Sequence, residues 1–319
     1  MSKYLVTGGA GFIGSHIVEE LLKKGEDVVV LDNFFSGKES NLSFVKDYQP
    51  SAISYKLIRG DICDKQACLD ACKDVDYILH QAALRSVPKS MESPHDYNRV
   101  NIDGTLTVLE AAKECGVKRV VIASSSSVYG DTDKFPQRED AYPLLISPYA
   151  LSKLTTEFYC RIFSENYGVE TVALRYFNVF GPRQALDDEY AVVIPKFITC
   201  ILTDVQPPIF GNGLQSRDFT FVKNVVQANI LAATTPGASG EVFNVALGSD
   251  VSILQLVAVI NKFADKSIEP NLLPIRKGDV FKTMADVTNI TEKLNFQPEF
   301  TFEQGMKVTF DWFKSQQKI

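Results

Sequence analysis

A tyrosine and a lysine one helical turn apart are the first residues of this sequence whose types and spacing could do chemistry. The segment SPYALSK places Tyr149 four residues before Lys153 and directly after Ser147 and Pro148. Serine is a favoured N-cap and proline suits the first turn, so we expect a helix with Tyr149 and Lys153 on one face. A nearby ammonium lowers a tyrosine pKa that is otherwise about 10. The pair is either an acid–base device or a surface tyrosine stacked on a lysine stem.

The elements that position this pair follow an alternating pattern. Expected strands are 3–7, 27–32, 55–61, 76–83, 117–126 and 170–179, and expected helices are 12–25, 64–72, 101–115 and 149–166. Such alternation predicts an α/β fold, a Rossmann-like doubly wound parallel sheet covered on both faces. After Asn178 prolines and glycines become denser and the elements shorter, which predicts a smaller mixed C-terminal subdomain.

A glycine-rich loop follows the first expected strand. The segment TGGAGFIGS carries Gly8, Gly11 and Gly14, and it also reads as G-x-G-x-x-G from Gly9. Between a strand and a helix, such glycines let backbone amides approach a pyrophosphate at the helix N-terminus. Asp32 ends the next strand, 18 residues after Gly14. A carboxylate there accepts from a ribose 2′-OH and repels a 2′-phosphate, so NAD is favoured over NADP.

Two further segments are expected at the same edge of the sheet. RGDI ends the third strand and would place Asp61 and Ile62 near an adenine. The serines at 124–127 end a later strand, and ligands of open parallel sheets bind beyond the carboxyl ends of strands. Tyr149 and Lys153 would then meet a serine hydroxyl there, where Tyr149 could take a proton from a sugar hydroxyl during hydride transfer.

Bulk composition narrows the class of protein. The chain has 319 residues, 45% hydrophobic and 23% charged, with a net charge of −6. This is typical of a globular enzyme and argues against general nucleic-acid binding. No apolar run is long enough to cross a membrane, and no signal peptide is recognisable. The six cysteines form no C-x-x-C pair, which indicates reduced thiols in the cytoplasm, and three scattered histidines suggest no metal site.

Taken in order, the segments TGGAGFIG, Asp32, HQAA, SSSSVYG and YALSK resemble the extended short-chain dehydrogenase/reductase family. The resemblance covers essentially the whole chain. LRYFNVFGPRQ, SRDFTFV and IRKGDV are similar to UDP-hexose 4-epimerases, and HQAALRSVPKS is most like UDP-N-acetylglucosamine 4-epimerases. It implies an NAD-binding Rossmann domain over 1–176, which carries the catalytic residues, and a UDP-sugar-binding subdomain over 177–319, with interleaved boundaries.

The resemblance also implies roles for individual residues. The catalytic ones would be Ser125, Tyr149 and Lys153. A tightly bound NAD would contact Gly8, Gly11, Phe12, Ile13, Gly14, Asp32, Asn33, Ser36, Gly37, Asp61, Ile62, Gln81, Ala82, Ala83, Tyr149, Lys153, Tyr176 and Val179. The UDP-sugar would contact Arg85, Ser86, Ser125, Ser126, Tyr149, Asn178, Val193, Phe210, Arg217, Arg276, Asp279 and Thr283. Of these, Arg217 and Arg276 would clamp the diphosphate and Asp279 would accept from the uridine ribose.

The implied reaction is epimerisation at C4 of a UDP-sugar through a 4-keto intermediate. Thr283 falls at the family position that closes the sugar pocket, and its small size implies UDP-GlcNAc and UDP-GalNAc as substrates, with UDP-Glc and UDP-Gal in addition. The family also implies a homodimer in which the helices beginning near Asn101 and Tyr149 form a four-helix bundle. Alternatively, these helices pack only on their own sheet.

Other functions remain open on the sequence. Related dehydratases carry an Asp-Glu pair where this chain has Ser126 and Ser127, which disfavours elimination and, less firmly, decarboxylation. Arg85 stands where a small residue is common and would suit a uronic acid carboxylate, so a UDP-glucuronate 4-epimerase or decarboxylase is an alternative. A non-catalytic NAD sensor is a third class, disfavoured because Tyr149 and Lys153 are both present.

Overall fold

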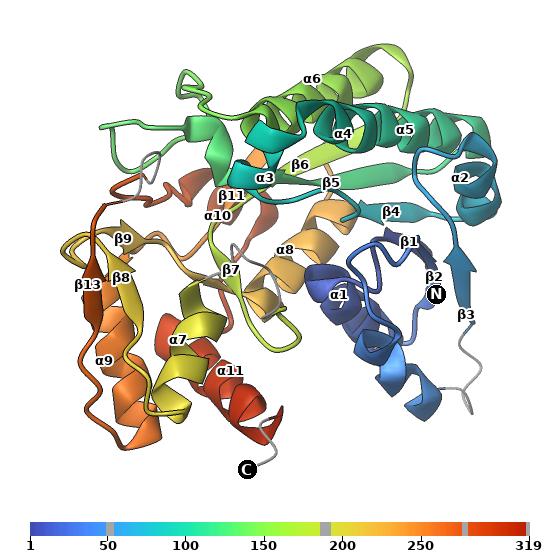
Figure 1. The fold of residues 1–319 in the computed structure, drawn as a ribbon. Coiled ribbons are helices and arrows are strands. Elements are labelled where there is room, and N and C mark those ends of the chain that lie inside the picture. Colours follow the sequence, from blue (N-terminus) through green and yellow to red (C-terminus); the bar gives the residue numbers. More distant parts are fainter. Residues whose placement is uncertain (49–53, 186–192, 276–279, 317–319) are drawn as a thin grey trace.

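The structure is a computed structural model that describes residues 1–48, 54–185, 193–275 and 280–316 (Figure 1). Its elements, in chain order, are β1 (Lys3–Thr7), α1 (Phe12–Lys23), β2 (Asp27–Asp32), η1 (Glu39–Asp47), β3 (Tyr55–Arg59), α2 (Lys65–Cys72), β4 (Tyr77–His80), α3 (Val87–Glu92), α4 (Pro94–Tyr97), η2 (Asn98–Asp103), α5 (Gly104–Cys115), β5 (Arg119–Ser125), η3 (Ser126–Tyr129), α6 (Pro148–Asn166), β6 (Glu170–Tyr176), β7 (Val179–Phe180), α7 (Val193–Leu202), β8 (Pro208–Phe210), β9 (Ser216–Arg217), β10 (Thr220–Phe221), α8 (Val222–Thr234), β11 (Val242–Val245), β12 (Val251–Ser252), α9 (Ile253–Ala264), β13 (Asn271–Leu273), α10 (Thr288–Leu294) and α11 (Phe302–Gln316).

One parallel sheet of seven strands organises the larger part of the chain, in the order β11-β6-β5-β4-β1-β2-β3. Helices α2, α5 and α6 cover one face, and α1 and α8 cover the other (Figure 1). Successive residues of a strand pack on opposite faces of the sheet. Leu5 packs in the core under α2, α5 and α6, whereas Val6 packs in the core under α1 and α8. The predicted Rossmann-like α/β fold is confirmed.

The strand expected over 170–179 is interrupted in the structure. Asn178 has a φ of 36°, in the left-handed region, so β6 ends at Tyr176 and the chain turns into the short strand β7. β7 pairs in parallel with β10 instead of extending the large sheet. The large sheet instead gains β11, which comes from the expected second segment and pairs with β6.

A second lobe is built from β7, α7, β8, β9, β10, β12, α9, β13 and α11 (Figure 1). Its core is rich in phenylalanine, with Phe180, Phe197, Phe221 and Phe310 almost fully buried. In the described part of this lobe the strands pair in two-stranded ladders, so its loops depend on side-chain contacts. Within the described ranges, no helix combines the length and apolar character that crossing a bilayer requires.

Candidate active site

A large cleft lies along the carboxyl ends of the sheet strands and is shared with the second lobe. Its volume is about 2240 Å³, above the roughly 300–1,000 Å³ of pockets for drug-sized ligands. The predicted residues that line it are Gly8, Gly11, Phe12, Ile13, Gly14, Asp32, Asn33, Ser36, Asp61, Ile62, Gln81, Ala82, Ala83, Arg85, Ser125, Ser126, Tyr149, Lys153, Tyr176, Asn178, Val179, Arg217 and Thr283. The structure therefore brings most of the predicted site residues together.

A few predicted residues lie elsewhere. Val193 and Phe210 line an adjoining cavity of about 430 Å³, which shares Asn178 and Arg217 with the cleft. Gly37 and Ser86 line neither space: Gly37 packs against the Asp32 carboxylate, and the Ser86 hydroxyl caps α3 by accepting from Lys89 N. Arg276 and Asp279 lie outside the described residues.

The glycine loop is shaped for a close approach of backbone to ligand. Gly8 has a φ of +67°, and a Cβ on Gly14 would lie 2.2 Å from the Gly8 carbonyl oxygen, so both positions require glycine. Gly11 is the N-cap of α1 and offers no side-chain cap. Because glycine has no side chain to accept from them, the first N–H groups of α1 are left to face the cleft. A bound phosphate could accept hydrogen bonds from these groups.

Asp32 is held rigidly at the end of β2. Its carboxylate accepts from Ala10 N at 2.9 Å and from Phe34 N at 2.8 Å, and the side chain is buried at the cleft wall. Gly37 lies so close that a Cβ there would be 2.9 Å from an Asp32 oxygen. This fixed acid beside the glycine loop fits the ribose of an NAD molecule.

The proposed catalytic residues meet at the end of β5. Ser147 caps α6 by accepting from Ala150 N at 3.1 Å, and Pro148 occupies the first turn, as the sequence predicts. Tyr149 hydrogen bonds with Ser125 and opens to the cleft. Lys153 lies one turn further and is buried, with its Nζ 6.0 Å from the centre of the Tyr149 ring.

The pKa values differ from the expectation for this pair. Burial raises the pKa of Tyr149, against the Ser125 hydrogen bond and the positive charge of Arg85, which lower it. Lys153 Nζ donates to Ala123 O at 2.7 Å, so the ammonium is turned to the strand rather than to the phenol. Burial also lowers the pKa of Lys153 to about 8. The sequence predicts a lowered pKa for Tyr149, whereas the net shift is upward, because desolvation of the phenol outweighs the Ser125 hydrogen bond and the charge of Arg85.

Buried hydrogen bonds brace the strand ends on which the site is built. His80 bridges Thr7 Oγ1, at 2.6 Å from its Nδ1, and Thr105 Oγ1, at 3.0 Å from its Nε2. Burial lowers the pKa of His80 to about 3, so the ring is neutral. Tyr176 O–H contacts Gln81 Oε1 and Asn229 Oδ1 at 3.1 Å each. These bonds join β1, β4, β6, α5 and α8 beneath the cleft.

The opposite wall centres on Thr283. Its hydroxyl accepts from Asn178 Nδ2 at 3.0 Å and from Asp218 N at 3.3 Å, and the side chain is buried. The Asp218 carboxylate accepts from three backbone N–H groups, those of Leu247, Gly248 and Ala285. Arg217 donates to Phe281 O at 3.1 Å and lines the cleft. Asp218 thus fixes the segments that carry Asn178, Arg217 and Thr283.

Sequence reasoning missed four polar residues at this site. The side-chain amide of Asn101 accepts from the backbone N–H of Leu84 and donates to the backbone carbonyl of Leu84. It also donates to the Ser152 hydroxyl on α6. Gln184 is buried between the two cavities, and its Oε1 has no hydrogen-bond partner among the described residues. Glu157 and Arg175 form a buried ion pair. A signal existed for this pair, because Glu157 continues the Tyr149–Lys153 spacing and Arg175 interrupts an apolar strand.

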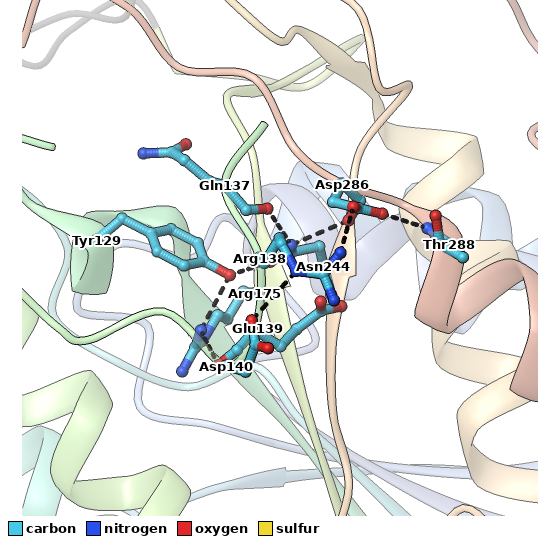
Figure 2. A network of polar contacts seen from close by, with 9 residues as sticks. All are labelled: Tyr129, Gln137, Arg138, Glu139, Asp140, Arg175, Asn244, Asp286 and Thr288. Atoms are coloured by element: carbon cyan, nitrogen blue, oxygen red, sulfur yellow. Dashed lines mark hydrogen bonds and ion pairs between the residues drawn. The ribbon is translucent and has the colours of Figure 1, made fainter. Parts of the chain in front are cut away.

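Arg175 also anchors a polar network below the site (Figure 2). Its Nη1 donates to Tyr129 O–H at 2.9 Å, and Tyr129 donates to Asn244 Oδ1 at 2.6 Å. Asn244 in turn donates to the carbonyls of Gln137 and Asp286. The network joins β6, β11, the end of η3 and the loop at Gln137 to the segment that follows Thr283.

Comparison with known proteins identifies the family. Residues 4–246 match the NAD dependent epimerase/dehydratase family. The chain belongs to this family. It is 36% identical to a putative UDP-glucose 4-epimerase of Methanocaldococcus jannaschii, over 98% of both chains, and 35% identical to a UDP-N-acetyl-alpha-D-glucosaminuronate decarboxylase of Bacillus cytotoxicus, over 97% of both. A solved UDP-N-acetylglucosamine 4-epimerase of Methanobrevibacter ruminantium M1, in complex with UDP-N-acetylmuramic acid, is 43% identical over 99% of both chains, with a TM-score of 0.92.

Membership of the NAD dependent epimerase/dehydratase family gives the cleft its general chemistry. The protein is an NAD-dependent enzyme of UDP-sugars, and the glycine loop, the uncapped start of α1 and Asp32 fit this cofactor. When bound, NAD supplies a hydride acceptor and donor.

Proposed function

We propose that the protein interconverts UDP-GlcNAc and UDP-GalNAc by epimerisation at C4, with UDP-Glc and UDP-Gal as additional substrates. The observation that carries this proposal is the small Thr283 in the cleft wall, hydrogen bonded to Asn178. A small residue leaves room for an acetamido group at C2 of the sugar.

The residues at the end of β5 supply the proton transfers. The fraction of Tyr149 that is phenolate takes the proton from the sugar O4 as C4 is oxidised, and the phenol so formed returns this proton to O4 when C4 is reduced from the other face. Ser125 hydrogen bonds with Tyr149 and orients the phenol toward the sugar oxygen. Lys153 holds a positive charge beside them. Arg217 retains the diphosphate while the keto-sugar turns, so that the intermediate stays in the cleft.

The test compares two sugar pairs in wild type and in Thr283→Tyr. A tyrosine at this position overpacks the wall, at roughly 1–3 kcal/mol for extra buried groups, and would overlap the acetamido group first. We expect turnover of UDP-GlcNAc and UDP-GalNAc to be blocked and that of UDP-Glc and UDP-Gal to be retained. Thr283→Val, which keeps the size and removes the hydroxyl, is the matched control: it should still turn over both pairs, with KM raised to the same extent for each. Equal loss of both pairs in Thr283→Tyr would contradict a gating role.

A uronate substrate is the second candidate. Arg85 lines the cleft, and its positive charge acts on Tyr149, so it lies within electrostatic reach of the sugar. A guanidinium there suits a carboxylate, as in UDP-glucuronate, whether that sugar is epimerised or decarboxylated. Assay of a panel of UDP-sugars decides between the two. Activity confined to UDP-glucuronate, and lost in Arg85→Gln, would move the function to uronates.

A passive NAD sensor is distinguished by absorbance. If NAD stays tightly bound during the cycle, adding a UDP-sugar to purified protein should produce transient bound NADH. An enzyme shows this signal and loses it in Tyr149→Phe, whereas a sensor shows none in either.

We further propose a homodimer in the cytoplasm. The outer face of α6 exposes Leu151, Phe158 and Ile162, whereas most apolar residues of α5 are buried in its own core. An exposed apolar stripe suits a second copy of the same helix, paired about a two-fold axis. Light scattering should give a dimer for wild type and a monomer for Phe158→Glu. Six free cysteines suit a reducing compartment, which cell fractionation would test.

A further inference from the structure

Three residues of α6 spaced four apart each contact the end of β5. They are Tyr149, Lys153 and Glu157, and this spacing places them along one face of the helix. The contacts, in order along β5, are Ala123 O with Lys153 Nζ at 2.7 Å, the Ser124 hydroxyl with the Glu157 carboxylate, and Ser125 with Tyr149. The acid–base pair therefore has a third, acidic neighbour one turn further along α6.

The Glu157 carboxylate is fixed from the sheet. Arg175 donates from Nε to Oε1 at 2.9 Å and from Nη2 to Oε2 at 2.8 Å, and both side chains are 5% exposed. The Ser124 hydroxyl is a third donor. These donors fix the orientation of the carboxylate. Arg175 is itself held by the Tyr129 hydroxyl, so the negative charge has a defined place in the fold (Figure 2).

Among the residues that the structure describes, few charged groups act on Lys153. His80 approaches from β4 but is neutral, since its pKa is about 3, and Tyr149 is neutral near pH 7 because burial raises its pKa. Burial lowers the pKa of Lys153 to about 8, and the Glu157 carboxylate acts in the opposite direction. Arg175 lies on β6, pairs with Glu157 and is not among the charges that act on the pKa of Lys153. Of these groups, Glu157 is the one that favours the ammonium form.

We propose that Glu157 is a positioning residue of the reaction, whose carboxylate, held by Arg175 and Ser124, keeps Lys153 charged beside Tyr149 and ties β5 to α6. The inference rests on the proposed roles of Tyr149 and Lys153. It extends the site from the cleft into the core, where Glu157 acts without touching a substrate.

The decisive experiment removes both charges of the buried pair together. Replacing a buried ion pair as a unit avoids leaving one unpaired charge, so Glu157→Gln/Arg175→Gln is expected to fold. Because Glu157 is the charge that acts on Lys153, its loss should move the alkaline limb of the kcat/KM–pH profile to lower pH by about one unit or more. Affinity for NAD, measured by calorimetry, should weaken over the same pH range. The single variant Glu157→Gln should shift in the same direction with lower stability.

Two controls separate charge from structure. Arg161 and Glu165 form an exposed pair on the same helix, with an Nε–Oε1 distance of 2.7 Å, and Glu165→Gln/Arg161→Gln should leave the profile unchanged. Ser124→Ala removes one hydrogen bond but keeps the carboxylate. The rate should therefore fall, while the alkaline limb of the kcat/KM–pH profile stays at the same pH as in wild type.

Unchanged profiles for both rate and NAD affinity in the buried double variant would overturn the proposal, as would an equal shift in the exposed control. If wild type turns over no UDP-sugar, the proposed function fails, and the pH dependence of NAD affinity still decides the role of Glu157.

Discussion

The two walls of the cleft are built by different means. The sheet wall rests on seven parallel strands whose ends are braced by buried side chains such as His80 and Asn229. The wall of the second lobe rests on two-stranded ladders, and the Asp218 carboxylate ties three of its backbone N–H groups. Changes on the sheet wall should therefore affect chemistry and cofactor together, whereas changes on the other wall should alter which sugar is accepted.

The largest expected effect is loss of turnover in Tyr149→Phe. The change removes one hydroxyl and little volume, and general acid–base groups contribute roughly 10²–10⁴-fold to rate. NAD content, measured by chromatography of the denatured protein, should stay as in wild type. Ser125→Ala should lose less. Near-normal turnover in Tyr149→Phe would mean that another group moves the proton.

A smaller effect is expected from Gly14→Ala on the same wall. The new Cβ would lie 2.2 Å from the Gly8 oxygen, so the loop must shift, at about 1–3 kcal/mol for overpacking. Copurified NAD should be lost. Gly11→Ala is the matched control, because its Cβ would meet the same oxygen at 3.1 Å, and it should retain more NAD. Equal NAD content in the two variants would show that the loop is not rigid.

On the other wall, Asp218→Asn should lower stability through lost hydrogen bonds. Bonds to a charged group contribute roughly 1.5–3 kcal/mol, and the amide N–H₂ would face a backbone donor. NAD content should be retained, in contrast to Gly14→Ala. Asp140→Asn, at an exposed carboxylate, should have little effect.

The loss of stability in Asp218→Asn should depend on pH. Burial raises the pKa of Asp218 to about 6, from an ordinary value of 3.8, so the folded chain binds this proton at higher pH than the unfolded chain. Wild type should thus gain stability from this group as pH falls from about 6 to about 4, and Asp218→Asn should not. The deficit of the variant, measured by urea unfolding, should be larger near pH 4 than near pH 7. A constant deficit would contradict the raised pKa.

The smallest effects are expected from removing one hydroxyl on each wall, and they should distinguish the role of the sheet wall from that of the second lobe. Thr7→Val removes the hydroxyl that contacts His80 and Ala82 N, and Thr283→Val removes the one that contacts Asn178, each at about 1 kcal/mol. We expect Thr7→Val to weaken NAD binding and Thr283→Val to raise KM for the UDP-sugar. Calorimetry and initial rates measure the two. If either variant changed NAD affinity and KM for the UDP-sugar to the same extent, the two walls would not have separate roles.

The sequence predicts the local patterns of the site but not the contacts between segments that are distant in the chain. The glycine loop, Asp32 and the Tyr149–Lys153 helix are local patterns with a fixed place in a parallel sheet, so periodicity and spacing were enough to find them. The direction of the Tyr149 pKa shift depends on desolvation, which no spacing reveals. The partners of Glu157 and Asp218 lie 18 or more residues away, on strands and loops that meet only in the fold. The break of the strand at Asn178 likewise depends on a single left-handed residue.

The position of β11 at the edge of the sheet has a practical consequence. This strand pairs with β6 and buries Phe243 and Val245, yet it is reached only after the chain has passed through β7–β10 and α7. A fragment truncated after β6 would leave the hydrogen-bonding edge of that strand open, which is a template for aggregation. The cofactor-binding half therefore cannot be excised as one continuous piece, and exchange of specificity between relatives must be done by grafting loops into the intact chain.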